Sequence, residues 1–156
     1  MTKKNNIIFI FLVYTLVTSC GFKKINQGES MIHLQNISVN GEKRISYSLK
    51  NDILVISNSD AQSKYDLELD LKKTKSNKIK DSTGKVTRFN IEISANLNLQ
   101  NYYDTEVISR TFSKSADYDI ADNHSKTVGN EKAAIRLTVQ ELSEEIKKFI
   151  IIATKN

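Results

Sequence analysis

Residues 89–99 read Phe-Asn-Ile-Glu-Ile-Ser-Ala-Asn-Leu-Asn-Leu, an unbroken alternation of apolar and polar side chains. Successive side chains of a β-strand point to opposite faces, so this stretch predicts a strand with one face on a hydrophobic core and the other in water. Residues 65–72 alternate in the same way, from Tyr65 to Lys72. Because the turn-forming sequence Asp-Ser-Thr-Gly lies between them at 81–84, the two stretches predict a long antiparallel hairpin.

The residues that follow this hairpin predict a further strand and a helix. Ile108 and Phe112 share one face of residues 106–114, which is typical of a third strand. Residues 130–153 carry apolar side chains at the helical period, with charged side chains on the opposite side, and Asn130 is a suitable N-cap. The apolar stripe of this predicted helix comprises Ile135, Val139, Leu142, Ile146, Phe149 and Ile150.

The residues that precede the hairpin complete the predicted fold. Residues 31–40 predict a strand whose alternation slips once between Leu34 and Ile37, as it does at a β-bulge. Residues 42–56 fit a helix, because apolar residues fall four apart, and they also fit a strand, because residues 53–56 are all apolar. We therefore expect an α+β two-layer sandwich, with about four mainly antiparallel strands and two helices on one face of the sheet.

The first 19 residues have the composition of a secretory signal peptide. Lys3 and Lys4 precede an apolar stretch at 7–17, and small residues follow it. This stretch of eleven residues is well short of the roughly 20 that span a bilayer as a helix, which argues against a permanent transmembrane anchor. Residues 1–19 are therefore interpreted as a cleaved signal and left out of the fold.

Residues 17–20, Val-Thr-Ser-Cys, resemble a bacterial lipobox, in which the sulfur of the cysteine receives a diacylglycerol. Cys20 is the only cysteine of the chain, and it stands at the position where this pattern needs a thiol. Ordinary cleavage after Ser19, which would leave a free thiol, is the alternative. In the lipoprotein pathway Gly21, in place of Asp, implies release to the outer membrane, with the protein lipid-anchored on the periplasmic side.

The chain after the signal is expected to form one small domain on a tether. A length of 156 residues fits a single domain. Residues 20–30 are polar and predict a short lipidated tether. Residues 31–156 are assigned to a single α/β lipoprotein domain.

The composition argues against an enzyme and against a metal or cofactor site. One cysteine excludes an intrachain disulfide, and His33 and His124 form no grouping with it that could hold zinc or act as a catalytic triad. The glycines are scattered singly, so no glycine-rich loop could hold a nucleotide phosphate. We expect no catalytic activity, no cofactor and no metal.

Positive charge is concentrated at the end of the predicted hairpin. Residues 72–88 contain seven basic residues against Asp81 alone, a net charge of +6 in a chain of net charge +5. Clustered cations attract phosphates and carboxylates, but lysines also commonly protect a hairpin from aggregation. The candidate lipopolysaccharide-binding residues are Lys72, Lys73, Lys75, Lys78, Lys80, Lys85 and Arg88.

The pattern as a whole resembles the LptE family of lipopolysaccharide-assembly lipoproteins. The resemblance is carried by a lipobox that runs into Cys20-Gly21-Phe22, a strand, Asn40-Gly41 before a helix, long alternating strands in a hairpin, and a last helix that contains Glu-Lys-Ala-Ala-Ile at 131–135. Two features depart from the family: residues 23–25 are Lys-Lys-Ile where Pro and Tyr are common, and the first helix looks short.

The resemblance implies a two-helix, four-stranded sandwich that plugs the outer-membrane β-barrel LptD, assists its assembly and delivers lipopolysaccharide to the outer leaflet. It carries over one residue, Cys20, as the site of lipid attachment. The expected partners are an LptD-like barrel, lipopolysaccharide and the membrane, and no nucleic acid. Two alternatives stay open: a lipoprotein that assists a lipid or solute transporter, and a structural lipoprotein without a ligand.

Overall fold

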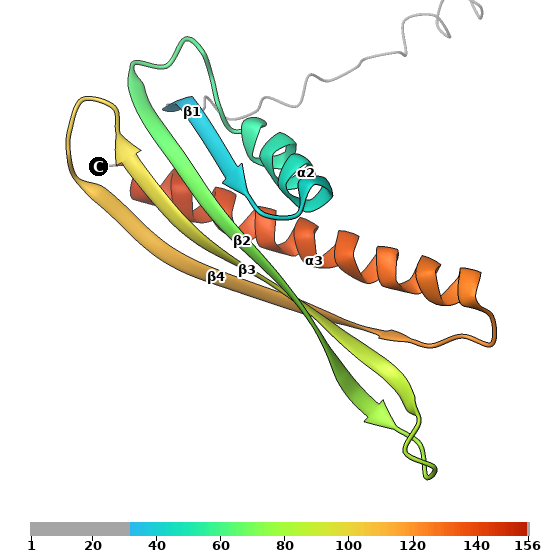
Figure 1. Ribbon diagram of the computed structural model, residues 1–156. Helices are drawn as coiled ribbons and strands as arrows, with labels where there is room; N and C mark the ends of the chain where they lie inside the picture. The colour runs from blue at the N-terminus through green and yellow to red at the C-terminus, as the bar shows by residue number, and fades with distance from the viewer. Residues whose placement is uncertain (1–31, 156) are drawn as a thin grey trace, which may run out of the picture.

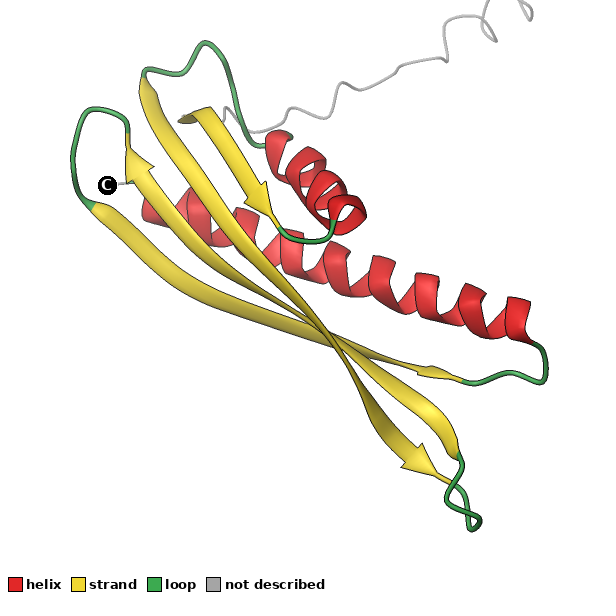
Figure 2. Ribbon diagram, in the orientation of Figure 1, coloured by secondary structure: helices red, strands yellow, loops and turns green. Residues whose placement is uncertain are grey.

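Two helices lie on one face of a four-stranded sheet in the computed structural model, which describes residues 32–155 (Figures 1 and 2). In chain order the elements are β1 (Ile32–Asn40), α2 (Lys43–Leu54), β2 (Ser63–Lys80), β3 (Val86–Asn101), β4 (Val107–Asp119) and α3 (His124–Ala153). The strand order is β1-β2-β3-β4; β1 runs parallel to β2, and the other neighbours are antiparallel. The predicted α+β sandwich is confirmed.

The hydrophobic core lies between the helices and the sheet. The alternation of β3 buries Ile91 and Ile93, and the helices cover them with residues that recur at the helical period, such as Leu49 of α2 and Ile146 of α3. The largest fully buried side chains in this layer are Leu49, Ile53, Leu67, Leu69, Ile91, Ile93, Leu97, Leu99, Leu142, Ile146, Ile150 and Thr138. This dense packing fixes the helices on one face and leaves the other face of the sheet polar.

The structure resolves the segment that fitted two interpretations. Residues 43–54 form α2, so the helical interpretation is the correct one. The apolar residues spaced four apart, Ile45, Leu49 and Ile53, are all buried in the core. The slip in the first strand is also confirmed, since the register of β1 against β2 shifts between Leu34 and Asn36.

The last helix begins earlier than the sequence predicted. It starts at His124 and not at residue 130, and its N-cap is Asn123, whose side chain accepts a hydrogen bond of 2.8 Å from the backbone N–H of Lys126. Asn130 instead donates its side-chain amide to the carbonyl oxygen of Asp119. The side chains of the first two turns of α3 are not buried. These turns therefore show no helical spacing of apolar residues from which the sequence could predict them.

The β2–β3 hairpin projects beyond the two helices (Figure 2). In β2 the side chains are exposed from residue 72 to residue 80, although the pairing with β3 continues to Lys80. β4 is longer than the predicted 106–114 and runs to Asp119 beside this hairpin.

The proposed signal (1–19), the tether (20–30) and Cys20 lie outside the described residues. Among residues 32–155, no helix has the length and apolar character needed to cross a membrane.

Candidate functional site

The turn at the hairpin tip is organised around Asp81. Its carboxylate oxygen accepts hydrogen bonds from the Thr83 hydroxyl at 2.6 Å, the Thr83 N–H at 2.9 Å and the Lys85 N–H at 3.0 Å. The hydrogen bond from the Thr83 hydroxyl is the main reason why the pKa of Asp81 lies below its ordinary value. Gly84 supplies the positive φ of 84° that closes the turn, so the tip is well defined.

Two of the seven predicted cations lie on the helix side of the hairpin and are neutralised there. Lys73 forms an ion pair with Glu42, and the Lys75 ammonium lies 3.1 Å from the carboxylate of Glu131 on α3. The Lys75 ammonium also lies 4.3 Å from the ring centre of Phe89. These two lysines hold the hairpin against the helices and offer little free charge to a ligand.

The pKa values around Lys75 reflect this contact. The hydrogen bond to the Tyr118 hydroxyl, followed by Glu131, raises the pKa of Lys75. Partial burial by itself would raise the pKa of the Glu131 carboxyl, but hydrogen bonds from Lys75 and Tyr118 outweigh it, so this pKa is lowered. Both groups are therefore held in their charged forms at neutral pH.

Two further cations of the predicted set are paired on the open face of the sheet. Arg88 donates two hydrogen bonds to Asp119, at 2.6 and 3.2 Å, which raise the pKa of Arg88 and lower that of Asp119. Lys78 lies 3.9 Å from the carboxylate of Asp117. Both pairs are exposed, so each contributes little to stability; Arg88 links β3 to β4, and Lys78 links β2 to β4.

The remaining three cations have no ion-pair partner among the described residues. Lys72 lies on the open face of β2 by alternation, while Lys80 and Lys85 flank the tip. The structure thus divides the predicted basic cluster into four paired residues and three free ones. The free ammonium groups of Lys72, Lys80 and Lys85 are the part of the hairpin that is available to an anionic ligand.

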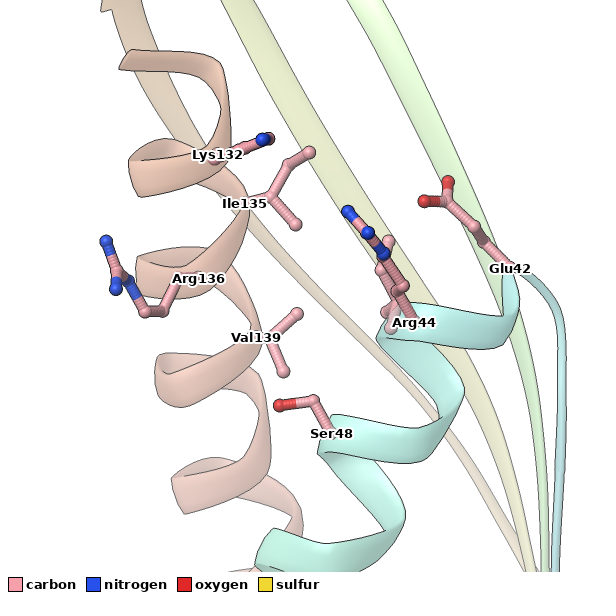
Figure 3. A pocket seen from close by; sticks show the side chains of 8 residues that line it. Glu42, Arg44, Ser48, Lys132, Ile135, Arg136 and Val139 are labelled. Carbon is pink, nitrogen blue, oxygen red and sulfur yellow. The ribbon is translucent and has the colours of Figure 1, made fainter. Parts of the chain in front are cut away.

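A second basic site, which the sequence did not predict, lies between the helices. A groove of about 220 Å³ separates α2 from α3. Figure 3 shows Arg44 and Lys132 directed toward this groove from opposite helices, beside Ile135, whereas Arg136 points away. Its lining residues are Glu42, Arg44, Ile45, Ser48, Lys132, Ile135, Arg136 and Val139.

The groove combines apolar walls with cations that have no ion-pair partner in the described part of the chain. Ile135 and Val139 supply apolar surface, and Arg44 and Lys132 supply charge. This arrangement suits a ligand that carries an anionic group next to an apolar part. The only signal in the sequence was the basic pair Lys132 and Arg136, spaced four residues apart; Arg44 could not be placed because its segment fitted two structures.

Comparison with known proteins identifies the fold. No family model and no curated protein matches the sequence. Solved structures match along most of their length. A lipoprotein from Caulobacter crescentus has 17% identity and a TM-score of 0.57, covering 81% of this chain and 93% of that chain. Rare lipoprotein B from Shewanella oneidensis has 13% identity and a TM-score of 0.54, covering 74% and 92%. A minor lipoprotein from Acinetobacter baumannii has 15% identity and a TM-score of 0.53, covering 76% and 91%.

These neighbours have the LptE-type fold, so the resemblance noted in the sequence is confirmed at the level of the fold. The chain shares with these lipoproteins the arrangement of two helices on a four-stranded sheet.

Proposed function

We propose that this chain is an outer-membrane lipoprotein, anchored through Cys20 on the periplasmic side, that plugs an LptD-like β-barrel and assists its assembly. In this role it takes part in moving lipopolysaccharide to the outer leaflet. The observation that carries the proposal is the fold shared with rare lipoprotein B along 92% of that chain. The lipobox-like sequence before Cys20 supports the anchor independently of the fold.

The open face of the sheet suits the interior of a barrel. Cross-strand hydrogen bonds join β3 to β4 along this face: the Ser109 hydroxyl donates to Asn98 at 2.7 Å, the Thr111 hydroxyl to Asn96 at 2.9 Å, and the Asn90 amide to Asp117 at 2.7 Å. Short polar side chains of this kind can lie against another polar, hydrated wall, because bridging waters can accept from the amide donors that remain. The interior wall of an outer-membrane barrel has this character.

The hairpin tip supports the lipopolysaccharide part of the proposal. Lys80 and Lys85 stand at the end that projects farthest from the helices, and Lys72 lies farther back along β2 (Figure 1). Their charge is not taken up by ion pairs among residues 32–155, so it can attract the phosphates of lipid A and the acidic core sugars. We assign contact with this ligand to these three residues ahead of the four that are ion-paired.

The interhelical groove favours a second candidate function, that of an auxiliary which binds a lipid for a transporter. The groove has two cations above apolar walls and is open to solvent on the helix side. The layer between helices and sheet, in contrast, is filled by side chains such as Leu69 and Ile93, which are fully buried. A lipid-binding auxiliary would therefore have to use the groove between the helices.

Affinity capture from membranes tests the barrel role. The tagged chain is purified from detergent-solubilised outer membranes, and the retained proteins are identified by mass spectrometry. We expect a large β-barrel at near-equal molar amount. Purification without such a barrel, but with a bound phospholipid in the mass spectrum, would support the auxiliary in its place.

The lipid anchor is tested separately with the variant Cys20→Ala. We expect the unchanged chain to incorporate labelled palmitate and to fractionate with the outer membrane. Cys20→Ala should lose both the label and the membrane fraction, since no other cysteine is present. Equal membrane fractionation of the two proteins would contradict the anchor.

A further inference from the structure

One end of the domain, which we call the entry end, is where the chain arrives from the tether. β1 begins there at Ile32, which pairs with Ser63 at the start of β2. The turn after β3 lies at the same end, because the N–H of Tyr102 donates to the carbonyl oxygen of Lys64 at 2.9 Å. The final turns of α3 reach it as well, as Figure 1 shows.

The packing of α3 on β4 fixes this arrangement. The rings of Phe112 and Phe149 are 5.5 Å apart, and Lys114 pairs with Glu145 at 2.7 Å. β4 and α3 are therefore antiparallel neighbours, so the residues that follow Phe149 run toward the start of β4. The C-terminal turn of α3 and the β3–β4 turn meet at the entry end.

Large apolar and aromatic side chains are exposed at the entry end. Tyr103 is 72% exposed and Ile152 is 70% exposed. Tyr102 packs its ring edge-to-face against Tyr103, with ring centres 5.4 Å apart, and remains 51% exposed. The exposed large apolar residues at this end include Tyr102, Tyr103, Val107, Ile151 and Ile152. Tyrosine beside isoleucine is typical of surfaces that meet the headgroup region of a bilayer.

The length of the tether limits how the domain can face its membrane. Eleven residues lie between Cys20 and Ile32, and the twelve residue steps from Cys20 to Ile32 span at most about 43 Å when fully extended. β2, which starts beside Ile32, is 18 residues long and therefore extends roughly 59 Å toward the hairpin tip. A domain anchored through Cys20 therefore cannot contact the membrane with its hairpin tip alone, because the distance from the membrane to Ile32 would then exceed the span of the tether.

We propose that the entry end rests on the headgroup region of the membrane that holds the lipid anchor, with Tyr103 and Ile152 inserted between the headgroups. The proposal rests on the anchor at Cys20 and describes the lipoprotein in a membrane without its barrel. Three acidic residues at this end, Asp60, Asp104 and Glu106, outnumber the basic residues Lys64 and Lys155. The contact therefore depends on apolar and aromatic surface, and zwitterionic lipids suffice.

Tryptophan fluorescence tests this orientation, because the chain has no tryptophan of its own. The mature lipoprotein is reconstituted into phosphatidylcholine vesicles that contain lipids brominated near the headgroup. The variants Tyr103→Trp and Ile152→Trp place the probe at the entry end. The matched control Tyr47→Trp places it on α2, away from this end, at a side chain that is 71% exposed.

We expect the brominated lipids to quench about half of the emission of Tyr103→Trp and Ile152→Trp and to leave Tyr47→Trp unchanged. Quenching at neither entry-end position, in protein that floats with the vesicles, would overturn the proposal and leave the anchor intact. Equal quenching at Tyr47→Trp would overturn it too, because the domain would then lie flat. Protein that fails to float overturns the anchor and this proposal with it, whereas the barrel role is decided by affinity capture alone.

Discussion

The Lys75 ammonium of β2 and the Glu131 carboxylate of α3 lie 3.1 Å apart although 56 positions separate them in the chain. Lys75 also lies over the ring of Phe89, and Tyr118 donates its hydroxyl to the same Glu131 oxygen at 3.0 Å. One cluster therefore joins the base of the projecting hairpin to the first turns of the long helix. A residue that the sequence assigned to ligand binding is used here to hold two elements together.

Replacing Lys75 by alanine should lower the free energy of unfolding by about 1 kcal/mol, because a half-exposed ion pair and a cation–π contact are each worth about 0.5–1 kcal/mol at most. Urea unfolding measured by circular dichroism checks this. Lys85→Ala, at the hairpin tip, is the matched control and should leave the free energy of unfolding unchanged. Equal losses for the two variants would contradict the structural role of Lys75.

The contribution of Glu131 should depend on pH on the acid side. Its pKa is lower in the folded protein than its ordinary value of 4.5, so the stabilisation is present above pH 4.5 and is lost as the pH falls through the folded pKa. The variant Glu131→Gln should thus be less stable than the parent near neutral pH, and the difference should shrink in acid. Urea midpoints of both proteins across this range measure it; a difference that grows in acid would refute the assignment.

Two glycine substitutions should change stability in opposite directions. Gly41 has a φ of 132°, and a Cβ there would lie 2.9 Å from the Cβ of Leu71, so Gly41→Ala should destabilise the fold by about 1–3 kcal/mol. Gly129 is inside α3 with nothing within 4 Å of an added Cβ. Gly129→Ala should therefore stabilise the protein by about 0.5–1 kcal/mol. Thermal unfolding of the two variants compares them directly, and a shift of the same sign in both would contradict this reading.

Reversing the charge of the three free hairpin lysines should weaken lipopolysaccharide binding. The triple variant Lys72→Glu, Lys80→Glu, Lys85→Glu should lower the affinity for lipopolysaccharide by about tenfold or more, since it replaces attraction by repulsion at the phosphates. Binding is measured with immobilised lipopolysaccharide at low and at high salt.

The control for this prediction carries the same change in net charge elsewhere on the domain. Lys43→Glu, Lys126→Glu, Lys148→Glu replaces three lysines that are also exposed. We expect its affinity to stay within a factor of about two of the parent. If the control loses as much affinity as the hairpin variant, net charge and not the hairpin governs binding.

The elements of the fold were largely predictable because each carries its own apolar period. β3 alternates strictly and buries Ile91 and Ile93 on one face, and the buried part of α3 repeats at the helical spacing. The start of α3 was wrong by six residues for the same reason, since the turns before Ala134 have no buried face to mark them. The periodicity of apolar residues in the sequence shows which residues are buried. It cannot show where an element ends when that element continues beyond the core.

The sequence predicts which charged residues the candidate site contains, but not which of them lie close together in the structure. The seven cations of residues 72–88 are visible in the sequence, but their partners Glu42, Asp117, Asp119 and Glu131 come from other elements. The basic groove between α2 and α3 was missed, because its two sides come from segments almost 90 residues apart. Spacing in the sequence predicts neither the neutralisation of four cations nor the position of Arg44 and Lys132 on the two sides of one groove.

The sequence by itself determined the fold class, the burial of one sheet face, the charge of the hairpin and the expected lipid attachment at Cys20. These properties depend on residue type and short-range period, which are local. Only the tertiary structure decided which cations remain free, that a basic groove opens between the helices, and that Tyr103 and Ile152 share the end at which the chain enters. Each of these depends on distances between elements remote in the chain, and those distances are set by the packing of the whole core.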